Sequence, residues 1–160
     1  MIRLATISDY KRLLQIFEAA KQFMKNTGNP NQWSKDYPGV KFIDEIKSGE
    51  VYVFDEDNHI YGAFLLHIGI DKTYNYIEGK WLNDNLYGTI HRVASDGSHK
   101  GLFVEMLDFC KTKVDDLRID THEDNKVMQK LILDNGFEYC GIIYIENGEP
   151  RRAYQLTRDK

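Results

Sequence analysis

The sequence predicts a mixed α/β domain in which a mostly antiparallel sheet is flanked by helices. Two strand-helix-strand units begin at Thr89 and Leu117, and units of this kind favour parallel strand pairing. Turn sequences at 55–58 and 147–148 instead join short β-rich runs into antiparallel hairpins. Together these patterns indicate about seven strands and about four helices, with a parallel pair at the centre of the sheet.

One domain over residues 1–160 accounts for the whole chain, which contains no internal repeat or long linker. Apolar residues make up 42% and charged residues 29%, as in a soluble globular protein, and no stretch reaches the ~18 apolar residues of a membrane span. The formal charge of −4 disfavours nucleic acid as a principal partner, because phosphate affinity requires clustered lysine and arginine. A cationic partner is compatible with that charge.

The cysteines and the N-terminus predict a reducing, cytoplasmic setting. Cys110 and Cys140 show neither zinc-ligand spacing nor a disulfide framework. Residues 1–10 lack the apolar core of a signal peptide. No metal site is expected, because three histidines in the second half of the chain do not form a zinc-binding pattern such as HExxH. These histidines are His91, His99 and His122.

The N-terminal half begins with a strand over 2–5 and a helix with Ser8 as its N-cap, which ends in the NTGNP sequence at 26–30. The polar segment 31–37 contains Trp33, which either covers the core or lines a ligand cleft. The buried stripe predicted for the helix consists of Leu13, Leu14, Phe17, Ala20 and Met24.

A second, short helix opens at Pro38 and ends before Gly49. Strands over 51–54 and 60–67 then form the first hairpin. Segment 69–87 carries four aromatic residues without a regular pattern, so it is expected to be irregular or partly extended. Long irregular segments in compact domains are often functional. The apolar residues of the second helix are Val40, Ile43 and Ile46.

The centre of the chain is a strand, a glycine-containing polar loop and an amphipathic helix over 89–114. The helix is predicted to begin near Ser98, and its exposed N–H groups and dipole would suit a phosphate. An ordinary strand-to-helix connection explains the same residues equally well. Neither GxxxxGK[ST] nor GxGxxG is present, which argues against an NTP or dinucleotide site. The apolar face consists of Leu102, Phe103, Met106, Leu107, Cys110 and Val114.

The C-terminal third contains a strand over 117–121, a helix capped by Asp124 and ended by Asn135-Gly136, and a hairpin of strands 137–145 and 151–157. The predicted buried face of the helix consists of Val127, Met128, Leu131 and Ile132.

This order of elements, the run SHKGLF at 98–103 and the segment LRIDTHEDNKVMQKLILDNGF at 117–137 resemble the GNAT superfamily of acyl-CoA-dependent N-acetyltransferases over nearly the whole chain. The resemblance implies a splayed parallel strand pair that binds acetyl-CoA, with the loop after the first of these strands around the pyrophosphate. The loop pattern in the family is Gln or Arg, two residues, Gly, one residue, then Gly or Ala. Gly101 matches the central glycine, whereas Ser98 and Phe103 depart from the outer positions, and Phe103 is expected to change how closely the pyrophosphate approaches.

The second segment implies that Asn125 hydrogen-bonds the pantetheine arm. Many family members have a tyrosine as the acid where this chain has Ile132, so Tyr139 is the remaining phenol for that role. The cofactor-binding residues implied by the resemblance are Arg92, Val93, Ala94, Ser98, His99, Lys100, Gly101, Leu102, Phe103, Asn125 and Met128.

The predicted activity is transfer of the acetyl group of acetyl-CoA to the primary amine of a small-molecule or peptide acceptor, in a ternary complex. A backbone N–H near Val93 would polarise the thioester carbonyl. An amine of pKa about 10.4 needs a base at pH 7, for which Glu78, His91 and His122 are candidates, each with an ordinary structural role as the alternative. The residues assigned to catalysis are Glu78, His122 and Tyr139.

A catalytically silent acyl-CoA-binding or protein-interaction module is the competing hypothesis, because Phe103 and Ile132 depart from the family pattern. The sequence leaves the acceptor unidentified and the oligomeric state open between a monomer and a homodimer.

Overall fold

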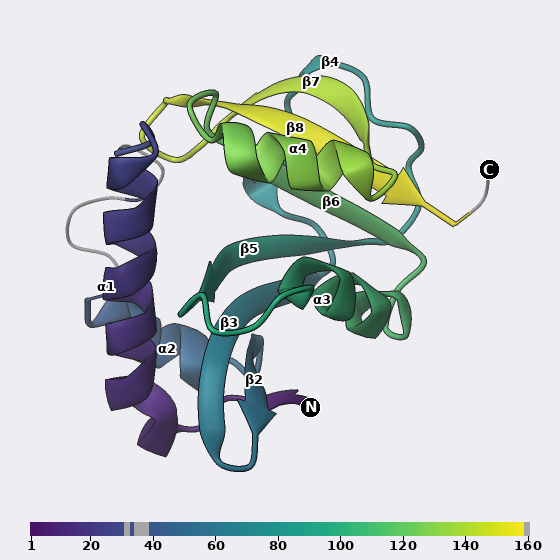
Figure 1. Ribbon diagram of the computed structural model, residues 1–160. Helices are drawn as coiled ribbons and strands as arrows, with labels where there is room; N and C mark the ends of the chain where they lie inside the picture. The colour runs from purple at the N-terminus through teal and green to yellow at the C-terminus, as the bar shows by residue number, and fades with distance from the viewer. Residues whose placement is uncertain (31–32, 34–38, 159–160) are drawn as a thin grey trace.

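The computed structural model, which describes residues 1–30, 33 and 39–158, confirms the mixed sheet (Figure 1). Within these residues eight strands pair in the order β1-β2-β3-β5-β6-β8-β7-β4, and β5 with β6 is the parallel pair. The strands are β1 Ile2–Leu4, β2 Val51–Glu56, β3 His59–Ile68, β4 Glu78–Gly79, β5 Tyr87–Ser95, β6 Asp116–Thr121, β7 Glu138–Tyr144 and β8 Pro150–Thr157. The helices are α1 Tyr10–Asn26, α2 Lys41–Lys47, α3 Leu102–Lys111 and α4 Lys126–Asp134, with short 3₁₀ helices η1 Ile7–Asp9 and η2 Lys72–Tyr74.

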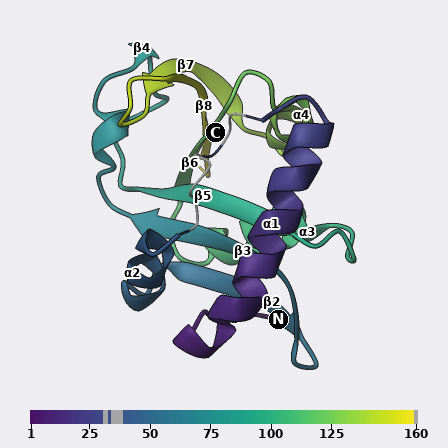
Figure 2. The same cartoon turned by 90° about the vertical axis from the view of Figure 1, so that its left-hand side faces the viewer.

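Helices cover both faces of the sheet (Figure 2). Buried side chains of α3 and α4 share one apolar cluster with β3, β5, β6 and β8. Buried side chains of α1 and α2 form a second cluster against β2 and β3. A third, smaller cluster joins Tyr74 of η2 to Tyr87, Ile143 and Ala153. The predicted irregular segment 69–87 therefore contributes to the core through Tyr74 and Tyr87, while its short strand β4 is exposed at the edge of the sheet.

Two local predictions of the hairpins are confirmed. β2 and β3 pair antiparallel around a tight turn, in which Asp57 and Asn58 both have positive φ, at 52° and 69°. Such a turn matches the right-handed twist of the strands it joins. The turn at Asn147-Gly148 likewise joins β7 to β8.

The predicted caps of α1 and α4 are wrong by one residue. Ser8 lies inside η1, and Asp9 caps α1 while its carboxylate accepts the Thr6 N–H at 2.8 Å. Asn125 rather than Asp124 caps α4, with its Oδ1 accepting the Met128 N–H at 3.1 Å. The Asn125 side chain reaches a free amide of the first turn of α4, whereas the Asp9 side chain makes no cap hydrogen bond to α1 and bonds back to Thr6 instead.

Helical periodicity overestimated the buried faces. In α1 the fully buried residues are Leu13, Ile16 and Phe17, and in α4 only Ile132 is buried. Val127 and Leu131 are 48% and 37% exposed, so their predicted burial is wrong. The reason is that α4 contacts the sheet along a narrow line, which a period of 3.6 residues does not reveal.

The second strand-helix-strand unit also differs from the prediction. β6 and β7 do not pair, because β8 lies between them and is antiparallel to both. The polar segment 31–37 and the start of the second helix at Pro38 lie outside the described residues, except for Trp33.

Candidate functional site

β5 and β6 pair over only part of their length and then separate. The parallel register runs from Tyr87 opposite Asp116 to Ile90 opposite Ile119 and ends there. Beyond this point the carboxyl ends of the two strands diverge, as Figure 1 shows. The predicted splayed pair is therefore present at the centre of the sheet.

A β-bulge in β5 accounts for the divergence. On the β3 side Ala63 pairs with Ala94 and Leu65 with His91, so that Arg92 and Val93 oppose a single residue of β3. Arg92 has a φ of 59°, in the left-handed region that is unfavourable for residues other than glycine. A bulge of this kind bends and twists the strand, which carries the end of β5 away from β6.

The loop after β5 leads to an open helix N-terminus. Gly101 caps α3 with a φ of 76°, and its carbonyl accepts the first intrahelical hydrogen bond, from the Glu105 N–H at 3.1 Å. The N–H groups of the first turn have no carbonyl acceptor within the helix. A Cβ at Gly97 or Gly101 would meet no atom within 4 Å, so the backbone is accessible there. This arrangement suits a phosphate. The predicted start of α3 at Ser98 is wrong, because Ser98 belongs to the loop.

Polar side chains hold this loop in shape. The Asp96 carboxylate accepts hydrogen bonds from the Ser98 N–H at 2.9 Å and from Arg12 at 2.7 Å. Burial would raise the pKa of Asp96, but the bonds from Ser98 and the charge of Arg12 lower it. His99 Nε2 lies 2.6 Å from a carboxylate oxygen of Glu56. The side chains of Ser98 and His99 therefore shape the loop, and its backbone remains available for a ligand.

Phe103 follows the loop but does not fill its opening. The side chain is 5% exposed and packs in the core cluster of α3, together with Met106 and Leu107. Only its backbone belongs to the open first turn. The departure from a small residue at this position is thus accommodated by the core, and it leaves the approach to Gly101 open.

On the other side of the divergence, two predicted residues follow β6. Asn125 caps α4 as described, and His122 is 14% exposed, with its Nδ1 accepting the Asp124 N–H at 3.0 Å. Both lie at the carboxyl end of β6, opposite the loop that follows β5.

Glu78 and Tyr139 lie farther along the sheet. Glu78 is on the edge strand β4, and its carboxylate accepts a hydrogen bond from the Tyr144 hydroxyl at 2.7 Å. Tyr139 on β7 packs edge to face on Tyr154 at 5.6 Å, with the Arg152 guanidinium 4.9 Å from its ring. The structure does not bring these two residues together with the carboxyl ends of β5 and β6, and their catalytic role remains a prediction.

One pair of residues at the divergence was not recognised in the sequence. His91 Nε2 lies 2.9 Å from Asp71 Oδ2, and Asp71 belongs to the irregular segment before η2. Asp71 also caps η2 by accepting the Thr73 N–H at 3.0 Å. The Asp-Lys-Thr sequence is a local signal for such a capped turn, but it gives no indication of the partner 20 residues later.

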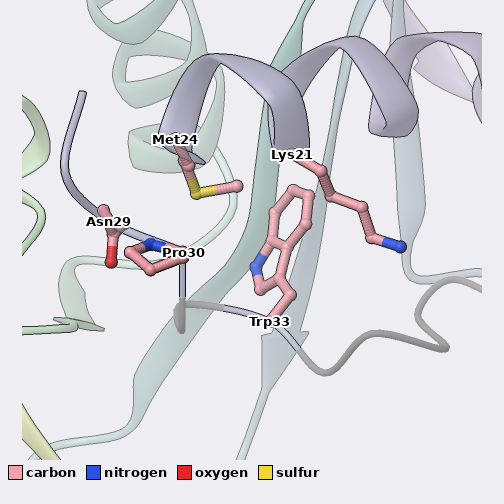
Figure 3. Close-up of a pocket in the computed structure, with 5 residues that line it drawn as sticks. All are labelled: Lys21, Met24, Asn29, Pro30 and Trp33. Atoms are coloured by element: carbon pink, nitrogen blue, oxygen red, sulfur yellow. The ribbon is translucent and has the colours of Figure 1, made fainter. Parts of the chain in front are cut away.

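A small recess lies at the end of α1 (Figure 3). Its volume of about 20 Å³ is that of a site for one water molecule. Asn29 is 2% exposed there, and within the described residues its carboxamide has no hydrogen-bond partner. Trp33 both lines the recess and packs on Phe17 at 5.3 Å. The lining residues are Lys21, Met24, Asn29, Pro30 and Trp33.

The described residues contain neither a membrane-spanning helix nor a cluster of metal ligands. None of the helices there is both long enough and apolar enough to cross a membrane. Among the same residues, no cluster of three or more histidine, cysteine, aspartate or glutamate side chains is arranged to hold a metal ion.

Comparison with known proteins identifies related structures. No protein-family model matches the chain, and no curated protein matches it. A GNAT-family acetyltransferase from Streptococcus agalactiae 2603 is 33% identical with a TM-score of 0.88, over 100% of this chain and 96% of that one. A putative acetyltransferase from Staphylococcus aureus Mu50 is 25% identical with a TM-score of 0.70, over 98% of each chain. N-acetylglutamate synthase from Neisseria gonorrhoeae, complexed with coenzyme A and N-acetyl-glutamate, shares the fold at 14% identity and a TM-score of 0.56, over 100% of this chain and 35% of that one.

Proposed function

The chain belongs to the GNAT family of acetyltransferases, and from that premise we propose that it transfers the acetyl group of acetyl-CoA to a primary amine by direct attack in a ternary complex. The observation that carries the proposal is the divergence of β5 from β6 beside the open N-terminus of α3. This arrangement offers a slot for an extended thioester and a group of backbone donors for its phosphates at the same end of the sheet.

The residues present fit acetyl-CoA as the donor. The open backbone at Gly97 and Gly101 and the first-turn amides of α3 would bind the pyrophosphate, helped by the positive end of the helix dipole. The pantetheine arm would run between the separated strands, along Arg92–Ala94 on one side and Asn125 on the other. The Neisseria gonorrhoeae synthase of the same fold is complexed with coenzyme A, which supports this donor.

The chemistry needs two contributions from the protein. A backbone N–H at the bulge, near Val93, would donate to the thioester carbonyl as negative charge develops on its oxygen. A base must take a proton from the acceptor, because an amine of pKa about 10.4 is protonated at pH 7 and has no lone pair for attack. Glu78, His122 and Tyr139 remain candidates for proton transfer. The buried Ile132 supplies no acid, which is tolerable because a thiol of pKa about 8.5 can leave as the thiolate.

Thermal unfolding with and without acetyl-CoA tests donor binding. At 100 times its dissociation constant, acetyl-CoA should add about 2.7 kcal/mol to the free energy of unfolding. Thiol release should then be followed with a panel of polyamines, amino acids, aminoglycosides and peptides, and it should depend on one of these amines. The absence of a thermal shift with both coenzyme A and acetyl-CoA would refute donor binding. Binding without amine-dependent thiol release would contradict the transferase and favour a binding module.

A further inference from the structure

His91 lies at the point where β5 leaves β6. The preceding residue, Ile90, is the last to pair with β6, and the bulge at Arg92 and Val93 follows immediately. Ile90 belongs to the core cluster under α3 and α4, so alternation along the strand places His91 on the opposite face. The imidazole is 32% exposed there. It is therefore accessible to an acceptor that enters from the face opposite α3.

Asp71 fixes the orientation of this imidazole. Its Oδ2 lies 2.9 Å from His91 Nε2, while its Oδ1 accepts hydrogen bonds from the Thr73 N–H at 3.0 Å and the Thr73 hydroxyl at 2.7 Å. The Asp71 N–H donates to the Tyr87 hydroxyl at 2.9 Å, so the backbone is held as well. Each oxygen of the carboxylate thus has a donor, and the side chain cannot turn without losing several hydrogen bonds.

The carboxylate determines which nitrogen of His91 carries the proton. Burial would raise the pKa of Asp71, but the hydrogen bonds from His91 and Thr73 outweigh it and lower the pKa to about 2. An ionised carboxylate only accepts, so the proton of a neutral His91 must be on Nε2. The unprotonated nitrogen is then Nδ1, which has no hydrogen-bond partner in the part of the chain that the structure describes. Its lone pair is available to a proton from outside.

The charges near His91 favour a cation over an anion. The ring of Tyr74 lies 6.2 Å from the imidazole, and its hydroxyl donates to Asp120 of β6 at 2.6 Å. Burial, followed by the charge of Asp120, raises the pKa of Tyr74 well above its ordinary value, so the phenol stays neutral. The neighbouring Arg92 lies 3.9 Å from the carboxylate of Glu45. A second guanidinium, that of Arg118, lies 3.9 Å from the centre of the Tyr87 ring. The carboxylates of Asp71, Asp120 and Glu45 therefore outnumber the two guanidinium groups near this position, which suits an ammonium group.

We propose that His91 is the base that deprotonates the acceptor ammonium, and that Asp71 is the positioning residue that keeps Nδ1 unprotonated. The proposal rests on the acetyl transfer proposed above. His122 is a weaker candidate, because its Nδ1 already accepts the Asp124 N–H, and Glu78 is bonded to Tyr144 at the sheet edge. Only His91 combines an unbonded ring nitrogen with a place beside the bulge, among the described candidates.

The acceptor ammonium gives one proton to Nδ1 of His91, and the imidazolium is stabilised by Asp71. The freed nitrogen lone pair forms the C–N bond with the thioester carbonyl carbon, and the C–S bond breaks with its electron pair on sulfur. The second proton of the nitrogen passes to the thiolate, and His91 returns its proton to solvent. The products are the acetamide and coenzyme A.

Steady-state kinetics of His91→Gln and Asp71→Asn test this assignment, with His67→Gln as the matched control. His67 on β3 is also paired with a carboxylate, Glu50, but its other ring nitrogen lies 3.2 Å from the Ile70 carbonyl oxygen, so neither nitrogen is open to an acceptor. With spermidine or a lysine-containing peptide, whichever gives thiol release, His91→Gln should lower kcat/KM by about 10²–10⁴-fold and abolish the rise of the rate with pH. Asp71→Asn should give a smaller loss, because an amide can either donate or accept and no longer holds the proton of the neutral imidazole on Nε2.

Two further readouts separate a base from a structural residue. The thermal shift caused by acetyl-CoA should be the same in His91→Gln and in the wild type. With trifluoroethylamine, which is neutral at neutral pH, His91→Gln should lose less of the wild-type rate than it does with protonated amines. Unchanged kcat/KM in His91→Gln with an intact pH profile would overturn the proposal. A wild type that releases no thiol with any amine contradicts the proposed function instead. In that event ¹⁵N NMR still tests the role of Asp71, because a neutral His91 with its proton on Nδ1 would refute it.

Discussion

Replacement of Gly101 by alanine tests whether the loop before α3 binds the donor through its backbone. Gly101 has a φ of 76°, and a Cβ there would meet no protein atom within 4 Å. The added methyl group would therefore occupy space that the structure leaves open to a ligand. Gly28, at the end of α1, has a φ of 87° and the same open surroundings, and it is the matched control.

The two substitutions should cost similar stability. The left-handed conformation costs an L-residue about 1–2 kcal/mol, and the loss of glycine's freedom in the unfolded chain returns about 0.4–1 kcal/mol. The net loss of about 1 kcal/mol corresponds to a decrease in Tm of about 2–4 °C for a domain of this size. Without acetyl-CoA, Gly101→Ala and Gly28→Ala should therefore unfold at similar temperatures.

The donor should distinguish them. At 100 times the wild-type dissociation constant, acetyl-CoA adds about 2.7 kcal/mol to the wild type and to Gly28→Ala, but about 1.4 kcal/mol to Gly101→Ala if the methyl group weakens binding tenfold. Thermal unfolding of both variants over a series of acetyl-CoA concentrations measures this difference. Full stabilisation of Gly101→Ala by acetyl-CoA would refute the idea that phosphate meets the backbone at this glycine. An equal decrease in both variants would show that the effect comes from strain alone.

Two other substitutions address the support of the site and its charges. In Gly62→Ala the Cβ would lie 2.5 Å from Leu102 Cδ1, so the start of α3 should move and the affinity for acetyl-CoA, measured by calorimetry, should fall. In Gly88→Ala the Cβ would lie 2.9 Å from core side chains, so urea unfolding should show a loss of about 1–3 kcal/mol of stability with no change in affinity. Equal affinities of the two variants for acetyl-CoA would contradict the prediction. The hydrogen bond to Glu50 raises the pKa of His67 above its unfolded value, so this contact stabilises the fold below about pH 6.5, and the stabilisation disappears as pH rises through the raised pKa. His67→Gln should therefore be less stable than the wild type only on the acid side of this range, as measured by its free energy of unfolding. A loss of stability that grows as pH rises would rule out the contact with Glu50 as its cause.

The turns and loops that depend only on residues adjacent in the sequence were predicted correctly, although one helix boundary was not. The tight turn at Asp57-Asn58 and the one at Asn147-Gly148 follow from residues that tolerate positive φ. The glycine-containing loop before α3 was likewise predicted, but the first helical residue is Leu102 and not Ser98. Ser98 is a good cap in isolation, but Asp96, two residues earlier, bonds both its N–H and its hydroxyl and keeps it in the loop.

The features that form the site depend on register between distant strands. The bulge at Arg92 arises because two residues of β5 oppose one residue of β3, and no pattern within β5 indicates it. The contact of His91 with Asp71 joins a strand to an irregular segment without periodicity. His91 could be named from the sequence as one of several bases, but its partner could not, because the position of Asp71 is set by the cap of η2 and the Tyr87 hydroxyl.

The absence of a tyrosine at Ile132 and the presence of a dyad at His91 are consistent with the energetics of the two proton transfers. At pH 7, deprotonation of an amine of pKa about 10.4 costs about 4.6 kcal/mol, at 1.36 kcal/mol for each of about 3.4 pKa units. Departure of a thiol of pKa about 8.5 as the thiolate costs only about 2 kcal/mol on the same scale. The base therefore removes the larger barrier, and an acid removes the smaller one. This chain has a buried isoleucine, Ile132, in place of the acid. It holds His91 beside the bulge with a carboxylate, Asp71, of pKa about 2. Under the proposed mechanism it therefore keeps the base, which lowers the larger of the two barriers.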